Sequence, residues 1–259
     1  AKSLDKFYNT NQLSSYFSGI LLLNNNQYED SQEYFKKLNG LETSHISYSV
    51  KYLYSLINSG NLREALNYSR KLEKKKLGNF ESYLVTGIFH LKNSNIDLAQ
   101  KYFLKAKNSN SRFVVNSYVS HSLYNLSSLS NFNQALFELQ KLDERFKNLK
   151  KIQKVFLGCY FDHTNSDKFF SELIYDQNTD FSRYYYFYAS YLALSGKIKE
   201  AKEIVDSALE TYPRNLLLNQ YKIDLNENRN VQAFNCKKEE HIISEILYIT
   251  SNALSAQSI

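Results

Sequence analysis

The sequence lacks tryptophan and methionine altogether, and its 259 residues include only one proline, two cysteines and seven glycines. Long hydrophobic runs are missing too. No segment approaches the ~18 consecutive apolar residues of a membrane-spanning helix, so we expect no membrane span. Apolar residues still make up 43% of the chain. A chain with a large apolar content and so few helix breakers is typical of an all-helical protein.

Motifs for catalysis and metal binding are also absent. The sequence has no glycine-rich phosphate loop, no nucleophile elbow and no metalloprotease helix motif. Adjacent carboxylates such as Asp143 and Glu144 point in different directions on a helix, so we expect them on a solvated surface. The sequence therefore predicts a non-enzymatic protein with no catalytic residue, no cofactor and no metal site. No two histidines stand at metal or catalytic spacing: His45, His90, His121, His163 and His241.

The most regular feature that is present is a repeat with a period of 34 residues. Its turn and the start of the following helix occur at Asn26–Tyr28, again at Gly60–Leu62 and again at Ser94–Ile96. Less regular copies begin at Ser130 and Gly196. A fixed period of this length predicts helix pairs that stack on their neighbours to bury their apolar faces.

Each unit is predicted to contain two helices joined by a short turn of Gly, Ser or Asn, where a left-handed backbone costs little. Asn61 with Glu64, and Asn131 with Gln134, resemble capping boxes at the start of the second helix. A small residue one turn later lets the two helices approach closely, and a large one would cost roughly 1–3 kcal/mol by overpacking. These small residues are Ala65, Ala99, Ala135 and Ala201.

The pattern resembles the tetratricopeptide repeat family. The units around Gly87 and around Ala189, the second of which ends at Pro213, carry the family's spacing of large apolar, small and aromatic residues. The resemblance covers residues 12–213. It implies an all-α fold, in which six to seven helix pairs form a right-handed superhelix and residues 1–259 form one solenoid domain.

Residues 214–259 are expected to add packing helices or a further repeat. We predict a helix over 215–226 and an amphipathic helix from His241 to about Gln257, which packs on the last repeat or begins another. This tail is similar to long, uncharacterised tetratricopeptide proteins of alphaproteobacteria, which implies that the chain is part of a longer array. A first residue Ala1 also fits a cleaved signal peptide, so we expect export to a bacterial periplasm, with the cytoplasm as the alternative.

The two cysteines are predicted to be separate. Cys159 falls in the fifth unit and Cys236 lies in the tail, and solenoid units contact only their neighbours, so we expect no disulfide between them. Cys159 and His163 share a helix face, but a zinc site usually needs four ligands. We therefore expect a buried thiol beside a histidine at the surface or in a turn, with no metal ion.

The resemblance assigns the concave groove of the array to the first helix of each pair. Several groove positions hold tyrosine, which offers a large rigid contact area with a polar tip. The alternative is that these tyrosines pack between adjacent first helices. The lysine clamp that grips a terminal carboxylate in some family members is missing, so we expect no binding of that kind. The groove positions are Tyr16, Ile20, Val50, Tyr54, Leu84, Ile88, Ser120, Tyr124, Tyr186 and Ser190.

Charge is distributed unevenly along a chain whose net charge is +6. Segments 63–76 and 139–154 each contain six basic and two acidic residues. Both lie near the ends of second helices, where the helix dipole favours cations by ~0.3–1 kcal/mol each. The alternative is a basic edge that meets an anionic partner. The edge residues are Arg70, Lys74, Lys75, Lys76, Lys147, Lys150, Lys151 and Lys154.

Two functions are consistent with these patterns. The favoured one is a non-enzymatic scaffold that binds a protein or peptide segment in its concave groove, alone or as a subunit of a larger assembly. The alternative is a pentatricopeptide-like protein that binds single-stranded RNA, since residues 49–80 also resemble one unit of that family. Only one unit fits the second pattern, so protein binding is preferred.

Overall fold

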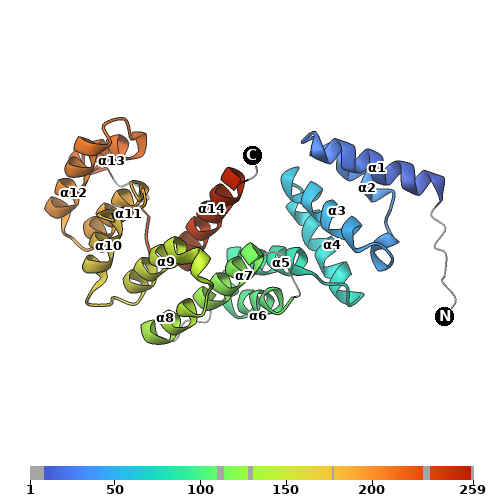
Figure 1. Cartoon of the computed structure of the whole chain (residues 1–259), viewed down its shortest axis with the longest axis horizontal. Coiled ribbons are helices and arrows are strands. Elements are labelled where there is room, and N and C mark those ends of the chain that lie inside the picture. The colour runs from blue at the N-terminus through green and yellow to red at the C-terminus, as the bar shows by residue number, and fades with distance from the viewer. Residues whose placement is uncertain (1–8, 110–113, 128–130, 177, 230–233, 258–259) are drawn as a thin grey trace. The chain divides into compact units, whose positions relative to one another are not determined.

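The computed structural model describes residues 9–109, 114–127, 131–176, 178–229 and 234–257, and its regular structure there is helical throughout (Figure 1). Two short 3₁₀ turns, Leu41–Thr43 and Glu144–Phe146, join some of the helices. The α-helices are α1 (Thr10–Asn24), α2 (Tyr28–Lys36), α3 (Ile46–Asn58), α4 (Leu62–Lys74), α5 (Phe80–Lys92), α6 (Ile96–Lys107), α7 (Val114–Ser127), α8 (Phe132–Gln140), α9 (Lys147–Tyr160), α10 (Ser166–Ile174), α11 (Arg183–Leu194), α12 (Ile198–Thr211), α13 (Leu216–Asn226) and α14 (Glu239–Gln257).

The turns inside the helix pairs confirm the predicted repeat. Asn26, Gly60, Ser94 and Gly196 all have a left-handed backbone, with φ between 57° and 80°. In each of these turns the next residue donates its backbone N–H to a carbonyl five residues earlier, over 2.9 Å. This bond satisfies a carbonyl that the end of the first helix would otherwise leave free. The 34-residue spacing in the sequence therefore marks the same turn in successive pairs.

Close helix packing explains the small residues in the pattern. Ala65, Ala99 and Ala201 are completely buried between helices, as the repeat predicted. Gly87 of α5 lies against α6, and a Cβ atom there would come within 2.5 Å of Cε1 of Phe103. No real side chain tolerates such a contact, so the two helices of this pair can approach only because position 87 is glycine.

The two helix caps predicted from the sequence have different outcomes. Asn131 caps α8, where its side chain accepts a hydrogen bond from the backbone N–H of Gln134. The prediction for Asn61 was wrong, because its side chain does not cap α4. The Asn61 amide instead donates to Oε1 of Gln32 over 2.8 Å, which ties the turn to the preceding helix α2.

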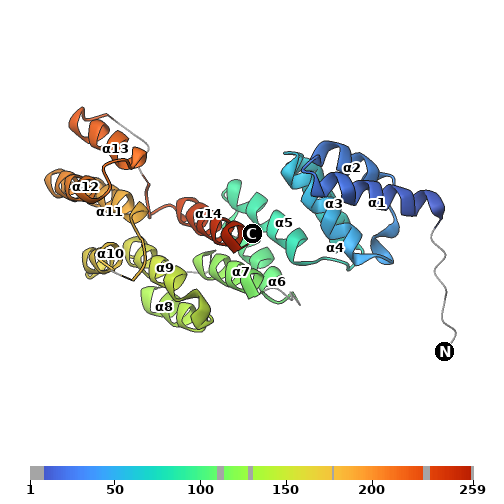
Figure 2. The same ribbon diagram turned by 45° about the horizontal axis from the view of Figure 1, so that its top comes forward.

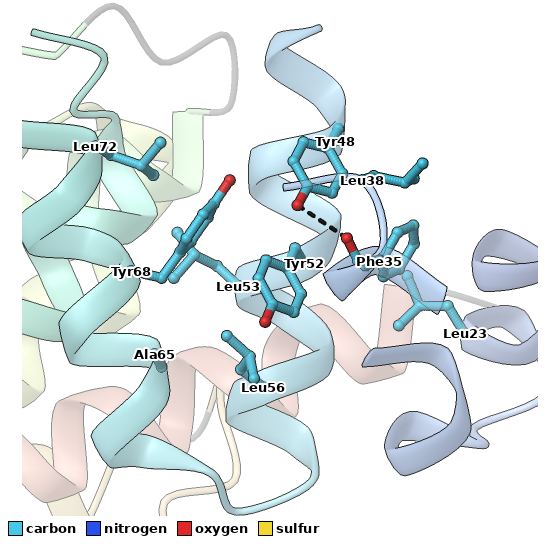
Figure 3. Packing of buried hydrophobic residues seen from close by; sticks show 10 residues of the cluster. All are labelled: Leu23, Phe35, Leu38, Tyr48, Tyr52, Leu53, Leu56, Ala65, Tyr68 and Leu72. Atoms are coloured by element: carbon cyan, nitrogen blue, oxygen red, sulfur yellow. Dashed lines mark hydrogen bonds between the residues drawn. The ribbon is translucent and has the colours of Figure 1, made fainter. Parts of the chain in front are cut away.

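The chain divides into two compact units, residues 1–112 and 113–259. The first contains the pairs α1–α2, α3–α4 and α5–α6. Figure 3 shows its aromatic core, in which Tyr48 and Tyr52 of α3 lie between Phe35 of α2 and Tyr68 of α4. The Tyr48 hydroxyl donates to the carbonyl of Phe35 over 2.9 Å, so a buried polar group is satisfied within the core. One continuous solenoid over residues 1–259 remains a prediction.

The second unit contains α7 to α14, and its last helix corrects the prediction for the tail. We expected this helix to pack on the last repeat or to begin another. Instead, α14 lies beside α7 and contacts α9, both of which precede it by several helices (Figure 2). Burial of Ile242 and Ile246, which have no exposed surface, drives this return.

The return of the chain also corrects the prediction for the cysteines. Cys159 of α9 and Cys236, just before α14, form a disulfide, and their Cα atoms are 5.9 Å apart. The expectation of separate thiols was wrong because it assumed that each unit contacts only its neighbours in sequence. The segment before α14 passes over α9 instead of continuing the array.

Candidate functional site

The first unit presents an exposed apolar surface on its first helices α1 and α3. On α3, Ile46 is 72% exposed and Tyr54, two turns later on the same side, is 51% exposed. On α1, Leu13 and Phe17 are also exposed, one turn apart. Together with Ile57 they form what we call the open A face. Large apolar side chains grouped on one side of neighbouring helices mark an interaction surface more often than scattered ones do.

The open A face is also almost free of charge. Helix α1 contains no acidic or basic residue, and α3 contains one, Lys51. A surface of this composition offers little attraction to phosphate groups or to charged peptide tails. It is suited to a partner that buries apolar side chains.

The predicted groove positions of the first unit fall on this surface or beside it. Tyr54 is exposed, and the other five are half-buried. Tyr16 illustrates the second group: its ring lies 4.7 Å from that of His45, centroid to centroid, and it packs on the unit's core. The alternative that tyrosines pack between first helices therefore describes Tyr16, whereas Tyr54 remains open. The half-buried positions are Tyr16, Ile20, Val50, Leu84 and Ile88.

Sequence reasoning missed four other exposed members of the face: Leu13, Phe17, Ile46 and Ile57. A signal for two of them was present, because Leu13 and Phe17 stand four residues apart in a helix that has no charged residue on its outer side. The predicted groove positions did not include them, because those positions were assigned from the residues that line the groove in other tetratricopeptide proteins.

The equivalent face of α9, in the second unit, is closed. Cys159 occupies in α9 the place that Tyr54 occupies in α3, since each follows the residue, Gly158 or Leu53, that is buried within its helix pair. Cys159 is only 1% exposed, because the segment that leads into α14 covers it. Helices α3 and α9 therefore differ: the A face of α3 is open, whereas that of α9 is covered by part of the chain itself.

The groove positions predicted for the second unit are half-buried or buried where the structure describes their side chains. Tyr124 and Tyr186 are half-buried, and the ring of Tyr186 lies 4.9 Å from that of Tyr221 of α13. Ser190 is completely buried and offers no surface to a partner. The side chain of Ser120 lies outside the described ones.

The first basic segment is largely engaged within its own unit. The carboxylate of Glu42 is fully buried, and its Oε1 atom accepts hydrogen bonds from the ammonium groups of Lys71 at 2.8 Å and Lys75 at 2.7 Å. Arg70 lies over the ring of Phe89, with 5.6 Å between the guanidinium carbon and the ring centroid. Lys74 and Lys76, which belong to the same predicted edge, are exposed.

The second basic segment behaves in the same way. Lys150 pairs with Glu144 and donates to the carbonyl of Leu142, and Lys151 pairs with Asp176. Lys154 lies over the ring of Phe169 at 4.2 Å, and Lys147 is exposed. The two segments belong to different units, and several of their cations form ion pairs or ring contacts within their own unit. The basic edge as a binding surface remains a prediction.

Glu42 makes the first unit sensitive to acid. Burial raises the pKa of this carboxyl, but hydrogen bonds from Lys71, Lys75 and the backbone outweigh burial and lower it from 4.5 to about 2. A carboxyl with a depressed pKa stabilises the fold above its unfolded pKa and loses that contribution as pH falls. We expect a loss of about 2 kcal/mol in the unfolding free energy of the first unit between pH 5 and pH 3.

Urea unfolding of the native chain and of Glu42→Gln at pH 7 and pH 3 measures this contribution. The variant should be less stable than the native chain at pH 7 and should lose about 2 kcal/mol less on acidification. Glu33→Gln, at an exposed carboxylate of α2, is the matched control. If the unfolding free energy of Glu42→Gln fell between pH 7 and pH 3 by as much as that of the native chain, groups other than Glu42 would be the cause.

A separate hollow of about 600 Å³ lies beside α2 and α4, on the second helices of the first unit. Charges of both signs line it, including Lys36, Arg63 and Glu64. Glu64 accepts a hydrogen bond from the hydroxyl of Tyr52 over 3.1 Å. The hollow therefore lies on the second helices, whereas the predicted groove lies on the first helices. Because charges of both signs line it, its charge does not indicate which class of ligand would bind.

Metal chemistry has no candidate among the residues that the structure describes. No group of three or more His, Cys, Asp or Glu side chains there could hold a metal ion. The pair that the sequence suggested, Cys159 and His163, is unavailable because Cys159 is in a disulfide.

No helix within the described ranges is long and apolar enough to cross a membrane.

Comparison with solved structures identifies the fold. A tetratricopeptide repeat protein from Parabacteroides merdae matches over 94% of this chain and all of its own, with a TM-score of 0.61 and 15% identity. Weaker matches are Naa15/Naa10 bound to HypK-THB, of which the chain covers 34% (TM-score 0.37, 13% identity), and TTC0263, a tetratricopeptide protein of Thermus thermophilus (TM-score 0.33, 14% identity). No protein-family model and no curated protein matches the sequence.

The match to the Parabacteroides merdae protein and the helices themselves show an all-α chain built from helix pairs of the tetratricopeptide type, as the 34-residue repeat predicted. At 15% identity the likeness concerns the fold alone. The similarity to alphaproteobacterial proteins and the groove residues remain predictions.

Proposed function

We propose that this protein is a non-enzymatic scaffold that binds a protein partner through the open A face of its first unit. The observation that carries the proposal is the contrast between the two units. Ile46 and Tyr54 are exposed on α3, whereas the corresponding face of α9 is covered by the chain's own C-terminal segment. An apolar face that stays open on α3, while its counterpart on α9 is filled, supports a role in binding.

The proposal refines the predicted groove. Tyr54 and the half-buried Tyr16, Ile20 and Val50 contribute contact area and shape, while Leu13, Phe17 and Ile46 supply most of the exposed apolar surface. Partner binding is expected to be governed by a few such anchors, because a handful of interface residues commonly carries most of the binding energy, and tyrosine is frequent among them. Leu84 and Ile88 of α5 extend the same series of first helices.

RNA binding is the competing function, and ionic contacts distinguish the two. Log affinity for single-stranded nucleic acid falls with log salt by ~0.7 for each phosphate contact, whereas apolar docking is nearly independent of salt. Most cations of the two basic segments already have partners within the protein, which supports the protein-binding proposal.

A pull-down from source-cell lysate with the purified chain as bait tests the proposal. We expect mass spectrometry to identify a defined protein whose recovery is unchanged by nuclease and by raising salt from 0.1 to 0.5 M. Recovery that disappears with nuclease would replace the proposal with RNA binding. A second bait that carries Ile46→Ser/Tyr54→Ser in the open A face tests specificity, and it should recover less of that protein.

The disulfide supports the expectation of an exported location. Disulfides persist in oxidising compartments such as the bacterial periplasm and are rare in the cytosol. We therefore propose that the protein folds and meets its partner outside the cytoplasm. Partners should accordingly be sought among exported proteins.

A further inference from the structure

The C-terminal segment of the chain occupies the A face of the second unit in the way that a ligand would. Phe234 inserts between α9 and α11, with ring centroids 5.0 Å from Phe156 and 4.4 Å from Phe187. Helix α14 then continues along α7 and buries Ile242, Ile243 and Ile246.

Polar contacts fix the position of this segment at its middle. Glu245 of α14 is nearly buried and receives two hydrogen bonds from the guanidinium of Arg183, at 2.9 and 2.8 Å. The hydroxyl of Tyr184 donates to the same carboxylate over 3.3 Å. Both donors lie in the first turn of α11, so α14 is anchored to that helix by a charge-assisted pair.

A second set of contacts fixes the end that precedes α14. Lys237 donates to the carbonyl of Tyr160 over 2.9 Å and pairs with Asp162 at 2.5 Å. The disulfide between Cys159 and Cys236 lies beside these contacts and joins this end covalently to α9. The segment is thus held by a covalent bond at one end and by non-covalent contacts along the rest.

We propose that residues 234–250 form a lid on the A face of the second unit and that the Cys159–Cys236 disulfide fastens it. With the disulfide intact, the face is closed to partners. When the disulfide is reduced, the lid opens while α9 and α11 remain folded, and the apolar face that held it becomes available. This inference concerns the second unit and does not depend on binding by the first.

The redox step is a thiol–disulfide exchange with a dithiol. The Cys159–Cys236 bond breaks, both sulfur atoms leave as protonated thiols, and the two thiols of the reductant are oxidised to a disulfide. Both cysteines are nearly buried, so we expect the folded protein to resist mild thiols and to need a strong dithiol such as dithiothreitol.

Hydrogen–deuterium exchange of the full chain tests the lid. Oxidised protein, protein reduced with dithiothreitol and the Cys159→Ala/Cys236→Ala variant are compared, and peptides from the first unit serve as the internal control. We expect amides of residues 239–250 to exchange at least ~10-fold faster after reduction and in the variant, and to accelerate by a larger factor than the amides of α9 and α11.

Three results would overturn the proposal. Free thiols in the purified protein, found by peptide mapping without reductant, would remove the fastening. Unchanged exchange in α14 would show that the disulfide does not hold it. Equal acceleration of α9, α11 and α14 would show one cooperative core instead of a lid. Glu245→Gln, with the disulfide intact, adds a second test: only the part of α14 after residue 245 should exchange faster, and no change there would contradict the anchoring role of Arg183.

Discussion

Replacing Cys159 and Cys236 with alanine is expected to lower the unfolding free energy of the second unit by about 2–5 kcal/mol. The disulfide spans 77 residues of sequence and encloses α10 to α13, so it removes a large part of the conformational freedom of the unfolded chain. The loop-closure relation gives about 4.5 kcal/mol for a loop of this length, and smaller values are common in practice.

Denaturant unfolding, with hydrogen exchange as the readout, measures this loss of free energy separately in the two units. Peptides from α9 and α11 report on the second unit, and those from α3 and α4 report on the first, which contains no cysteine and should not change. Reduced native protein should behave as the double variant does, because both lack the same covalent link. Equal stability of the oxidised and reduced protein would contradict the structural role of the disulfide.

Much of the fold was predictable because its main determinants are local. Asn26, Gly60 and Ser94 stand 34 residues apart and each adopts the same left-handed turn. Ala65 and Ala99 mark the points where two helices approach closely. Such features act over one or two turns of helix, so a single sequence displays them directly.

The return of α14 was not predictable from the same reasoning. Cys236 reaches Cys159 only because the chain leaves the repeating pattern after α13, and nothing in the repeat specifies that departure. The apolar stripe through Ile242 and Ile246 correctly indicated that α14 packs on something. A stripe shows that a helix is covered on one side, but several surfaces in a helical array could cover it.

The candidate site was predictable in part for a similar reason. Repeat position located Tyr54 and Val50 on the first helices, since position within a unit determines the side of the helix. Exposure depends on what covers that side: Tyr54 is open, whereas Ser190 at the equivalent place in α11 is buried. The ion pairs in the basic segments could not be predicted for the same reason, because Glu42 approaches Lys71 and Lys75 only in the folded unit.

Substituting Ile46 and Tyr54 with serine is expected to weaken partner binding by at least ~10-fold, or about 1.4 kcal/mol. Both side chains are large, exposed and on one side of α3, so each can become buried against a partner. Serine removes that apolar area, and truncation of a central anchor commonly costs more than 1 kcal/mol. The chain's own stability should change little, because neither residue belongs to the core.

Leu216→Ser/Ile223→Ser is the matched control. Leu216 is the first residue of α13, as Ile46 is of α3, and it is 84% exposed. Ile223 lies two turns later and is also exposed. This variant therefore removes a comparable apolar surface from a helix of the second unit and leaves the open A face intact.

The most direct measurement is a dissociation constant for the partner that the pull-down recovers. It is measured with the native chain and with each of the two double variants. Binding through the open A face predicts at least ~10-fold weaker binding for Ile46→Ser/Tyr54→Ser and an unchanged value for Leu216→Ser/Ile223→Ser. The same dissociation constant for all three proteins would contradict it, and so would an equal loss in both variants.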